Sequence, residues 1–122
     1  MVVIAVGMTT FVFNQIRLQN HAKDMIRRRS LILDTRVEAM QLAWILNAYK
    51  HDIGVNAPLE NKSLVKALMG DNLKREVFTE GYKLRLNGNG EVVDAFGEPF
   101  SFSYPNEIPQ VSSAEAGVTV TM

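Results

Sequence analysis

The first half of the sequence has the pattern of one long helix, and this feature constrains the fold most. Apolar residues recur at spacings of three and four from Ile16 to Tyr49, and no proline occurs before Pro58. Gly7 weakens the pattern, but an isolated glycine does not exclude a helix. A helix of roughly 50 residues is about 75 Å long at 1.5 Å per residue. One small domain cannot cover this length, so we expect part of the helix to lie in lipid or against other subunits.

Length and composition leave room for only one small domain besides the helix. The 122 residues have a formal net charge of zero: residues 1–54 carry seven basic and four acidic side chains, and residues 55–122 carry six and nine. This asymmetry is too mild for a nucleic-acid partner, which requires a dense basic face. The sequence has no cysteine, which excludes a disulfide framework and a thiolate metal site.

Residues 1–13 carry no charged side chain, but a helix that spans a bilayer needs about 20 apolar residues. A secretory signal would begin with basic residues and end in a small-residue cleavage site, and neither is present. A buried core helix is the alternative reading. All nearby basic residues follow the segment. If Met1 is the true start, the positive-inside rule places the C-terminal part in the cytoplasm, which competes with the location that the family resemblance below implies.

The second half predicts a short helix and several strands. Residues 58–70 form the helix, with Asn61 as its cap. Residues 82–86, 91–94 and 100–104 alternate like strands and are separated by turns, and residues 110–112 and 118–122 supply one or two more. We therefore expect an α+β fold: one long N-terminal helix with a small antiparallel sheet of about three strands packed on its C-terminal half.

Large aromatic and aliphatic residues predict where the helix and the sheet meet. Phe100, Phe102 and Tyr104 share one face of their strand because side chains alternate. The predicted helix–sheet core consists of Trp44, Ile45, Tyr49 and Phe102.

Several segments resemble one protein family. Asp94-Ala-Phe-Gly-Glu-Pro-Phe100 resembles the Asp-Pro-Trp-Gly-Asn-Pro-Tyr hairpin of the major pseudopilins of type II secretion systems, which are relatives of type IV pilins. Residues 63–72, 77–78 and 86–94 are similar to a pseudopilin-like subgroup in order and spacing. Met1-Val-Val-Ile-Ala-Val looks like the interior of the prepilin N-terminal segment, and residues 48–54 look like the end of its long helix.

The resemblance implies a structural subunit with a pilin-like fold. Residues 1–24 would be the part of the helix that packs in the membrane or the fibre, and residues 25–122 a globular head in the periplasm. The subunit would cross the inner membrane once and assemble with copies of itself or other pseudopilins, with the inner-membrane assembly platform and lipid as further partners. Fibre growth would then drive protein export. The implied assembly helix contains Val2, Val3, Ile4, Val6, Phe11, Val12 and Phe13. The implied structural hairpin contains Asp94, Phe96, Gly97, Pro99 and Phe100.

The sequence departs from the family pattern at both ends. The basic leader, the cleavage-site glycine and the following phenylalanine and glutamate are absent before Met1. We expect such residues upstream in the native protein, because about six of them would lengthen the apolar run to a plausible span. Where the family has its calcium loop, residues 112–117 offer only one acidic side chain, Glu115, and Glu107 is nearby in sequence. Calcium takes six to eight oxygen ligands, so we expect no cofactor, with calcium as the alternative.

No set of residues in the sequence predicts catalysis. There is no cysteine nucleophile and no phosphate-binding glycine motif, and no histidine lies near a serine in sequence. We therefore expect a protein that is not an enzyme. Two alternatives to the fibre subunit remain: a membrane-anchored module that binds a ligand or peptide, and a minor pilin in adhesion or DNA uptake.

Overall fold

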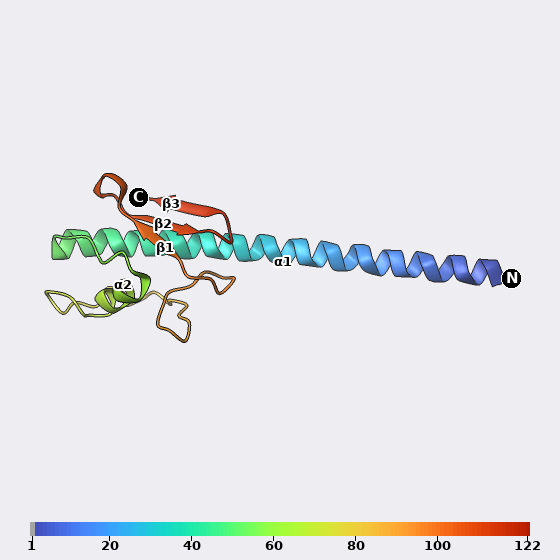
Figure 1. The fold of residues 1–122 in the computed structure, drawn as a ribbon, viewed down its shortest axis with the longest axis horizontal. Helices are drawn as coiled ribbons and strands as arrows, with labels where there is room; N and C mark the ends of the chain where they lie inside the picture. Colours follow the sequence, from blue (N-terminus) through green and yellow to red (C-terminus); the bar gives the residue numbers. More distant parts are fainter. Residues whose placement is uncertain (1) are drawn as a thin grey trace. The chain divides into compact units, whose positions relative to one another are not determined.

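The structure is a computed structural model that describes the backbone of residues 2–122 and the side chains of residues 19–122. The chain forms α1 (Val2–Ile53), α2 (Asn61–Leu68), β1 (Ser101–Ser103), the 3-10 helix η1 (Pro105–Glu107), β2 (Gln110–Ser113) and β3 (Val118–Thr121) (Figure 1). It divides into two compact units, one that ends at Ser30 and one that comprises Leu31–Met122.

Helix α1 ends where the sequence predicts. Gly54 has a φ of +91°, and its N–H donates a 2.9 Å hydrogen bond to the carbonyl of Lys50. This left-handed glycine is a common way to stop a helix, because glycine adopts positive φ without steric cost. Among the side chains that the structure describes, no helix contains a stretch apolar enough to cross a membrane. The predicted assembly residues from Val2 to Phe13 lie outside those side chains.

The C-terminal half contains a three-stranded antiparallel sheet in the order β1-β2-β3, which confirms the predicted α+β class. Phe102 pairs with Val111, and Val111 with Val120. The prediction of strands at residues 82–86 and 91–94 is wrong, because these segments form only the isolated bridges Leu86–Val92 and Val93–Pro99. Turns at residues 87–90 and 94–97 leave too few residues between them for a longer ladder.

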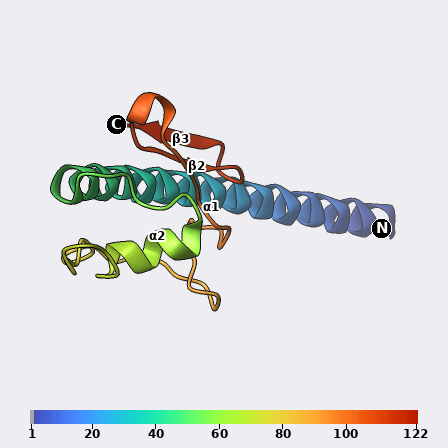
Figure 2. The same cartoon turned by 60° about the vertical axis from the view of Figure 1, so that its left-hand side comes forward.

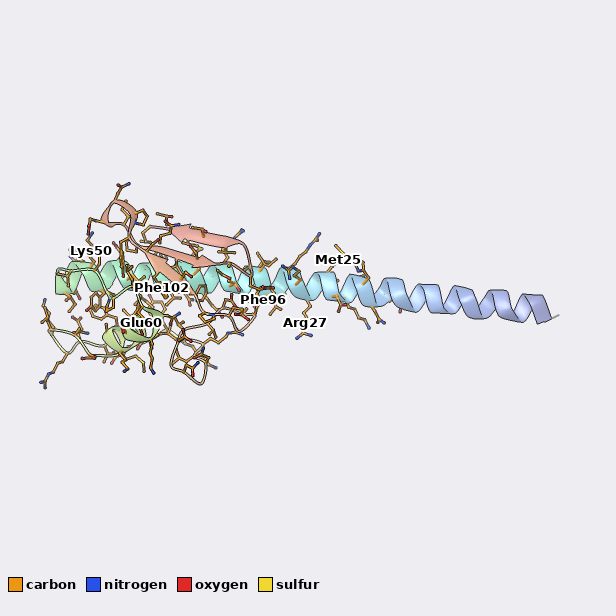
Figure 3. The ribbon with its side chains drawn as sticks, viewed as in Figure 1. Met25, Arg27, Lys50, Glu60, Phe96 and Phe102 are labelled. Atoms are coloured by element: carbon orange, nitrogen blue, oxygen red, sulfur yellow. The ribbon has the colours of Figure 1, made fainter. Side chains whose placement is uncertain are left out.

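The core lies between α1 and the elements that flank it. Both views show the sheet on one side of α1 and α2 on the other (Figures 1 and 2). The buried apolar residues of α1 recur at helical spacing and are Ala39, Leu42, Ala43, Ile45, Leu46 and Tyr49. The sheet and the segment before it contribute Val92, Phe100, Phe102, Val111 and Val118, and α2 contributes Leu64, Val65, Ala67 and Leu68. Phe102 lies where β1 crosses α1 (Figure 3).

The predicted place of Trp44 in the core is wrong, because 57% of this residue is exposed. Leu42 and Leu46 are buried, and Trp44 lies midway between them in sequence. At 3.6 residues per turn, a residue at this position points to the opposite side of the helix. Trp44 therefore faces away from the sheet, whereas Ile45 and Tyr49 face into the core.

Candidate interaction surface

An apolar stripe runs along the face of α1 that points away from the core. It consists of Leu33, Val37, Met40 and Trp44, and between 44% and 59% of each residue is exposed. Their spacing of four, three and four residues is the spacing of a helix–helix seam in coiled coils. Single exposed apolar residues are common, but an aligned row on one helix face indicates a surface for another molecule. We call these four residues the α1 stripe.

The hairpin predicted from the sequence is built around a buried carboxylate. Asp94 is fully buried, and its Oδ1 accepts hydrogen bonds from the N–H groups of Phe96 (2.9 Å) and Glu98 (3.0 Å). Its Oδ2 accepts a 2.6 Å hydrogen bond from the hydroxyl of Ser113 in β2. Gly97 turns the chain with a φ of +86°. A buried carboxylate must be hydrogen bonded, and these three donors hold the hairpin closed and join it to the sheet.

The remaining residues of the hairpin have separate roles. Pro99 forms the bridge with Val93, and Phe100 is buried in the core. Phe96 is partly buried. The hairpin also contacts α1, because the N–H of Ala95 donates a 3.1 Å hydrogen bond to the buried hydroxyl of Thr35. The hairpin thus links the sheet to the helix that carries the α1 stripe.

A second link between α1 and the hairpin is an ion pair. The guanidinium of Arg85 lies 3.0 Å from the Glu38 carboxylate and also donates to the carbonyl of Ala95 at 3.5 Å. The second carboxylate oxygen of Glu38 is buried and has no hydrogen-bond partner among the described residues. Burial raises the pKa of Glu38, and Arg85 only partly offsets this effect.

The predicted role of Asn61 as the cap of α2 is wrong, and the residue has a different structural role. It is the first residue of α2, and its side chain does not cap the helix. Its Nδ2 donates to the carbonyls of Val92 (2.8 Å) and Phe100 (2.9 Å), and its Oδ1 accepts from the N–H of Val92 (2.7 Å). The available signal was the spacing of Asn61 from Leu64, Val65 and Leu68, which places it on the buried face of α2. Asn61 therefore joins α2 to the backbone of Val92, before the hairpin, and of Phe100, at the end of the hairpin.

The two candidate calcium ligands do not form part of a larger acidic cluster. The Glu107 carboxylate accepts a 2.9 Å hydrogen bond from Asn56 and lies 4.0 Å from the Lys50 ammonium. Lys50 also donates to the Glu107 carbonyl. Within residues 19–122, no three His, Asp or Glu side chains gather as a metal site would require. Glu107 thus holds the loop after β1 to the end of α1.

Tyr104 is partly buried, and its hydroxyl oxygen is shielded from solvent. Burial raises the pKa of Tyr104 to about 12, with a smaller contribution from Tyr49. The backbone of Ala57 slightly favours the ionised form, although the Tyr104 hydroxyl makes no hydrogen bond of normal geometry with the described residues. Tyr49 packs its ring against Phe78, with 5.1 Å between the ring centroids. These contacts do not involve the α1 stripe.

Comparisons of the chain with protein-family models, with curated proteins and with solved structures find no match. The resemblance to pseudopilins therefore rests on the sequence segments quoted above.

Proposed function

We propose that the chain is a structural subunit of a pilin-like fibre, similar to a pseudopilin, and that copies assemble through α1. The observation that carries this proposal is the α1 stripe. The stripe lies opposite the core face and leaves four large apolar side chains about half exposed. Burial against the same helix of other copies removes this apolar surface from water.

The proposal includes a location and partners. The subunit is held in the inner membrane by the start of α1, and residues 25–122 lie in the periplasm. Its partners are copies of itself or other pseudopilins, lipid and an inner-membrane assembly platform, and its activity is assembly rather than catalysis. The uncharged sequence of residues 1–13 and the resemblance of the hairpin to that of pseudopilins support this reading.

The size of the stripe favours assembly of many concentrated copies over a tight pair in solution. Removal of a half-exposed large apolar side chain from water stabilises by roughly 1 kcal/mol, so four of them contribute about 4 kcal/mol. Association of two free proteins costs at least about 4 kcal/mol in translational and rotational freedom. The α1 stripe alone therefore gives weak pairing, and confinement in a membrane or a fibre is needed for stable contacts.

Cysteine cross-linking tests this proposal because the native chain has no cysteine. Val37→Cys places one thiol in the α1 stripe, and Lys62→Cys places one on the exposed face of α2 as a matched control. Each variant is oxidised in membranes of cells that produce it, and the covalent dimer is measured on a non-reducing gel. We expect a dimer several-fold more abundant for Val37→Cys. Equal dimer in both variants, or none in either, contradicts assembly through the stripe.

A further inference from the structure

Strand β3 has an open edge. It pairs with β2 alone, and the sheet order makes it the outermost strand (Figure 2). No backbone hydrogen bond joins its other side to another described residue. Natural proteins usually protect such edges with lysine, proline, a bulge or a covering element. The sequence Val-Thr-Val-Thr of β3 has no charged residue and no proline, and its β-branched residues favour strand pairing.

A groove of about 420 Å³ follows this edge. Gly117–Thr121 line one wall, and Arg36 and Met40 of α1 line the other. Consecutive residues of a strand point to opposite faces, so a groove lined by all five residues runs along the strand edge rather than over one face. The groove thus offers free main-chain donors and acceptors on one side and two α1 side chains on the other.

The two α1 side chains define the chemistry of the groove. Arg36 is exposed and forms no ion pair or hydrogen bond with any described residue. Among residues 19–122, no acidic side chain lines the groove, so the charge of Arg36 is not compensated there. Met40 is 44% exposed, and its flexible thioether adapts to different apolar partners.

We propose that this groove binds an extended peptide segment of a partner protein, which adds to β3 as a fourth strand and carries a carboxylate that pairs with Arg36. Main-chain hydrogen bonds to a strand edge supply affinity, and the side-chain contacts supply selectivity. The guanidinium recognises a carboxylate with two parallel hydrogen bonds, and Met40 contacts an apolar side chain of the segment. The five residues Gly117–Thr121 that line the groove span about 17 Å, so a segment of about five residues fills the edge.

This inference is independent of assembly through α1. The groove shares only Met40 with the α1 stripe, and Arg36 is not part of the stripe. A peptide titration does not require copies of the chain to contact one another. Cross-linking at position 37 and peptide binding at β3 can therefore succeed or fail separately.

The test uses the full chain, labelled with ¹⁵N in detergent micelles, and the synthetic peptide acetyl-Thr-Val-Thr-Val-Glu-amide. We expect the largest amide shifts at residues 117–121. The same peptide with lysine in place of glutamate should bind about five-fold more weakly, which is the size of a partly exposed ion pair. Lys62→Ala, on another exposed helix face, should leave binding of both peptides unchanged.

Charge reversal makes the test decisive. Arg36→Glu should lower the affinity for the glutamate peptide and raise the affinity for the lysine peptide. The order of the two affinities is then inverted. A glutamate peptide with N-methyl groups on alternate residues should not bind, because it cannot pair with the strand. Absence of shifts at residues 117–121, or the same order of affinity in Arg36→Glu, overturns the proposal.

Discussion

The Ser113 hydroxyl in β2 donates a 2.6 Å hydrogen bond to the Asp94 carboxylate, and both residues are almost completely buried. This contact ties the hairpin to the middle strand of the sheet. The neighbouring Ala95 amide binds Thr35 of α1, so the same few residues connect the hairpin, the sheet and the helix. The proposed assembly surface on α1 depends on this connection, because it fixes which face of the helix is covered.

Replacement of Asp94 should show how much the hairpin contributes to stability. Asp94→Ala leaves the N–H groups of Phe96 and Glu98 and the Ser113 hydroxyl without their acceptor in a buried site, and we expect a loss of about 3 kcal/mol in the free energy of unfolding. Asp94→Asn keeps one oxygen as acceptor for the two N–H groups, and its free energy of unfolding should fall by only about 1 kcal/mol. Urea unfolding measures both variants. Equal losses would mean that the hydrogen bonds to Oδ1 contribute nothing.

Asn61 gives a second prediction about the same region. Asn61→Ala removes three hydrogen bonds to the backbone of Val92 and Phe100, and the free energy of unfolding should fall by about 2–4 kcal/mol. Asn61→Asp should be at least as damaging, because it places an oxygen against two carbonyls. Thermal unfolding followed by circular dichroism checks this, with exposed Lys62→Ala as the neighbouring control. A stable Asn61→Asp variant would contradict the bonding described for this side chain.

The pH dependence of stability should contain a contribution from Glu38. Burial raises its pKa in the folded state, so the folded protein holds the proton more tightly than the unfolded chain. Stability therefore falls as the pH rises from about 4.5 through the folded-state pKa of Glu38. Glu38→Gln should remove this fall while it keeps an acceptor for Arg85. Urea unfolding across this pH range measures the effect, and Glu80→Gln at an exposed position is the control. An unchanged pH profile in Glu38→Gln would contradict the assignment.

Tyr104 leads to a prediction in the alkaline range. Its folded-state pKa of about 12 lies above the ordinary value of 10, so stability falls as the pH rises through this interval. Tyr104→Phe should abolish this contribution, and near pH 7 it should leave stability unchanged or slightly higher, because the buried hydroxyl has no hydrogen-bond partner among the described residues. Thermal unfolding at pH 7 and an ultraviolet titration of tyrosine measure these effects. A loss above about 1 kcal/mol in Tyr104→Phe would show that the hydroxyl is bonded.

The sequence predicts the helix and the fold class because both depend on local pattern. The absence of proline before Pro58 and the glycine at position 54 define α1, and the alternation around Phe102 defines a strand. Two apolar rows run along α1, one with Leu42, Leu46 and Tyr49 and the other with Trp44. Helical periodicity finds both rows but does not say which one the sheet covers, so periodicity alone does not exclude Trp44 from the core.

The long-range contacts of polar side chains are beyond local pattern. Asn61 has a residue type that often caps helices, but its partners lie 31 and 39 residues away in sequence. The bond from Ser113 to Asp94 spans 19 residues, and the Arg85–Glu38 pair spans 47. Such contacts depend on how the turns at residues 87–90 and 94–97 fold the chain back. The open edge of β3 likewise becomes visible only when the order of the strands is known.

The central claim is that copies assemble through the exposed face of α1, and the fluorescence of Trp44 tests this claim most directly. Trp44 is the one tryptophan of the chain and lies in the α1 stripe. The full chain is dispersed in detergent or reconstituted in vesicles, and quenching by aqueous acrylamide and by brominated lipid is measured. We predict strong acrylamide quenching in detergent and weak quenching by both agents in vesicles, because other copies then cover Trp44. Acrylamide quenching that stays strong in vesicles, or strong quenching by brominated lipid, would contradict assembly through this face.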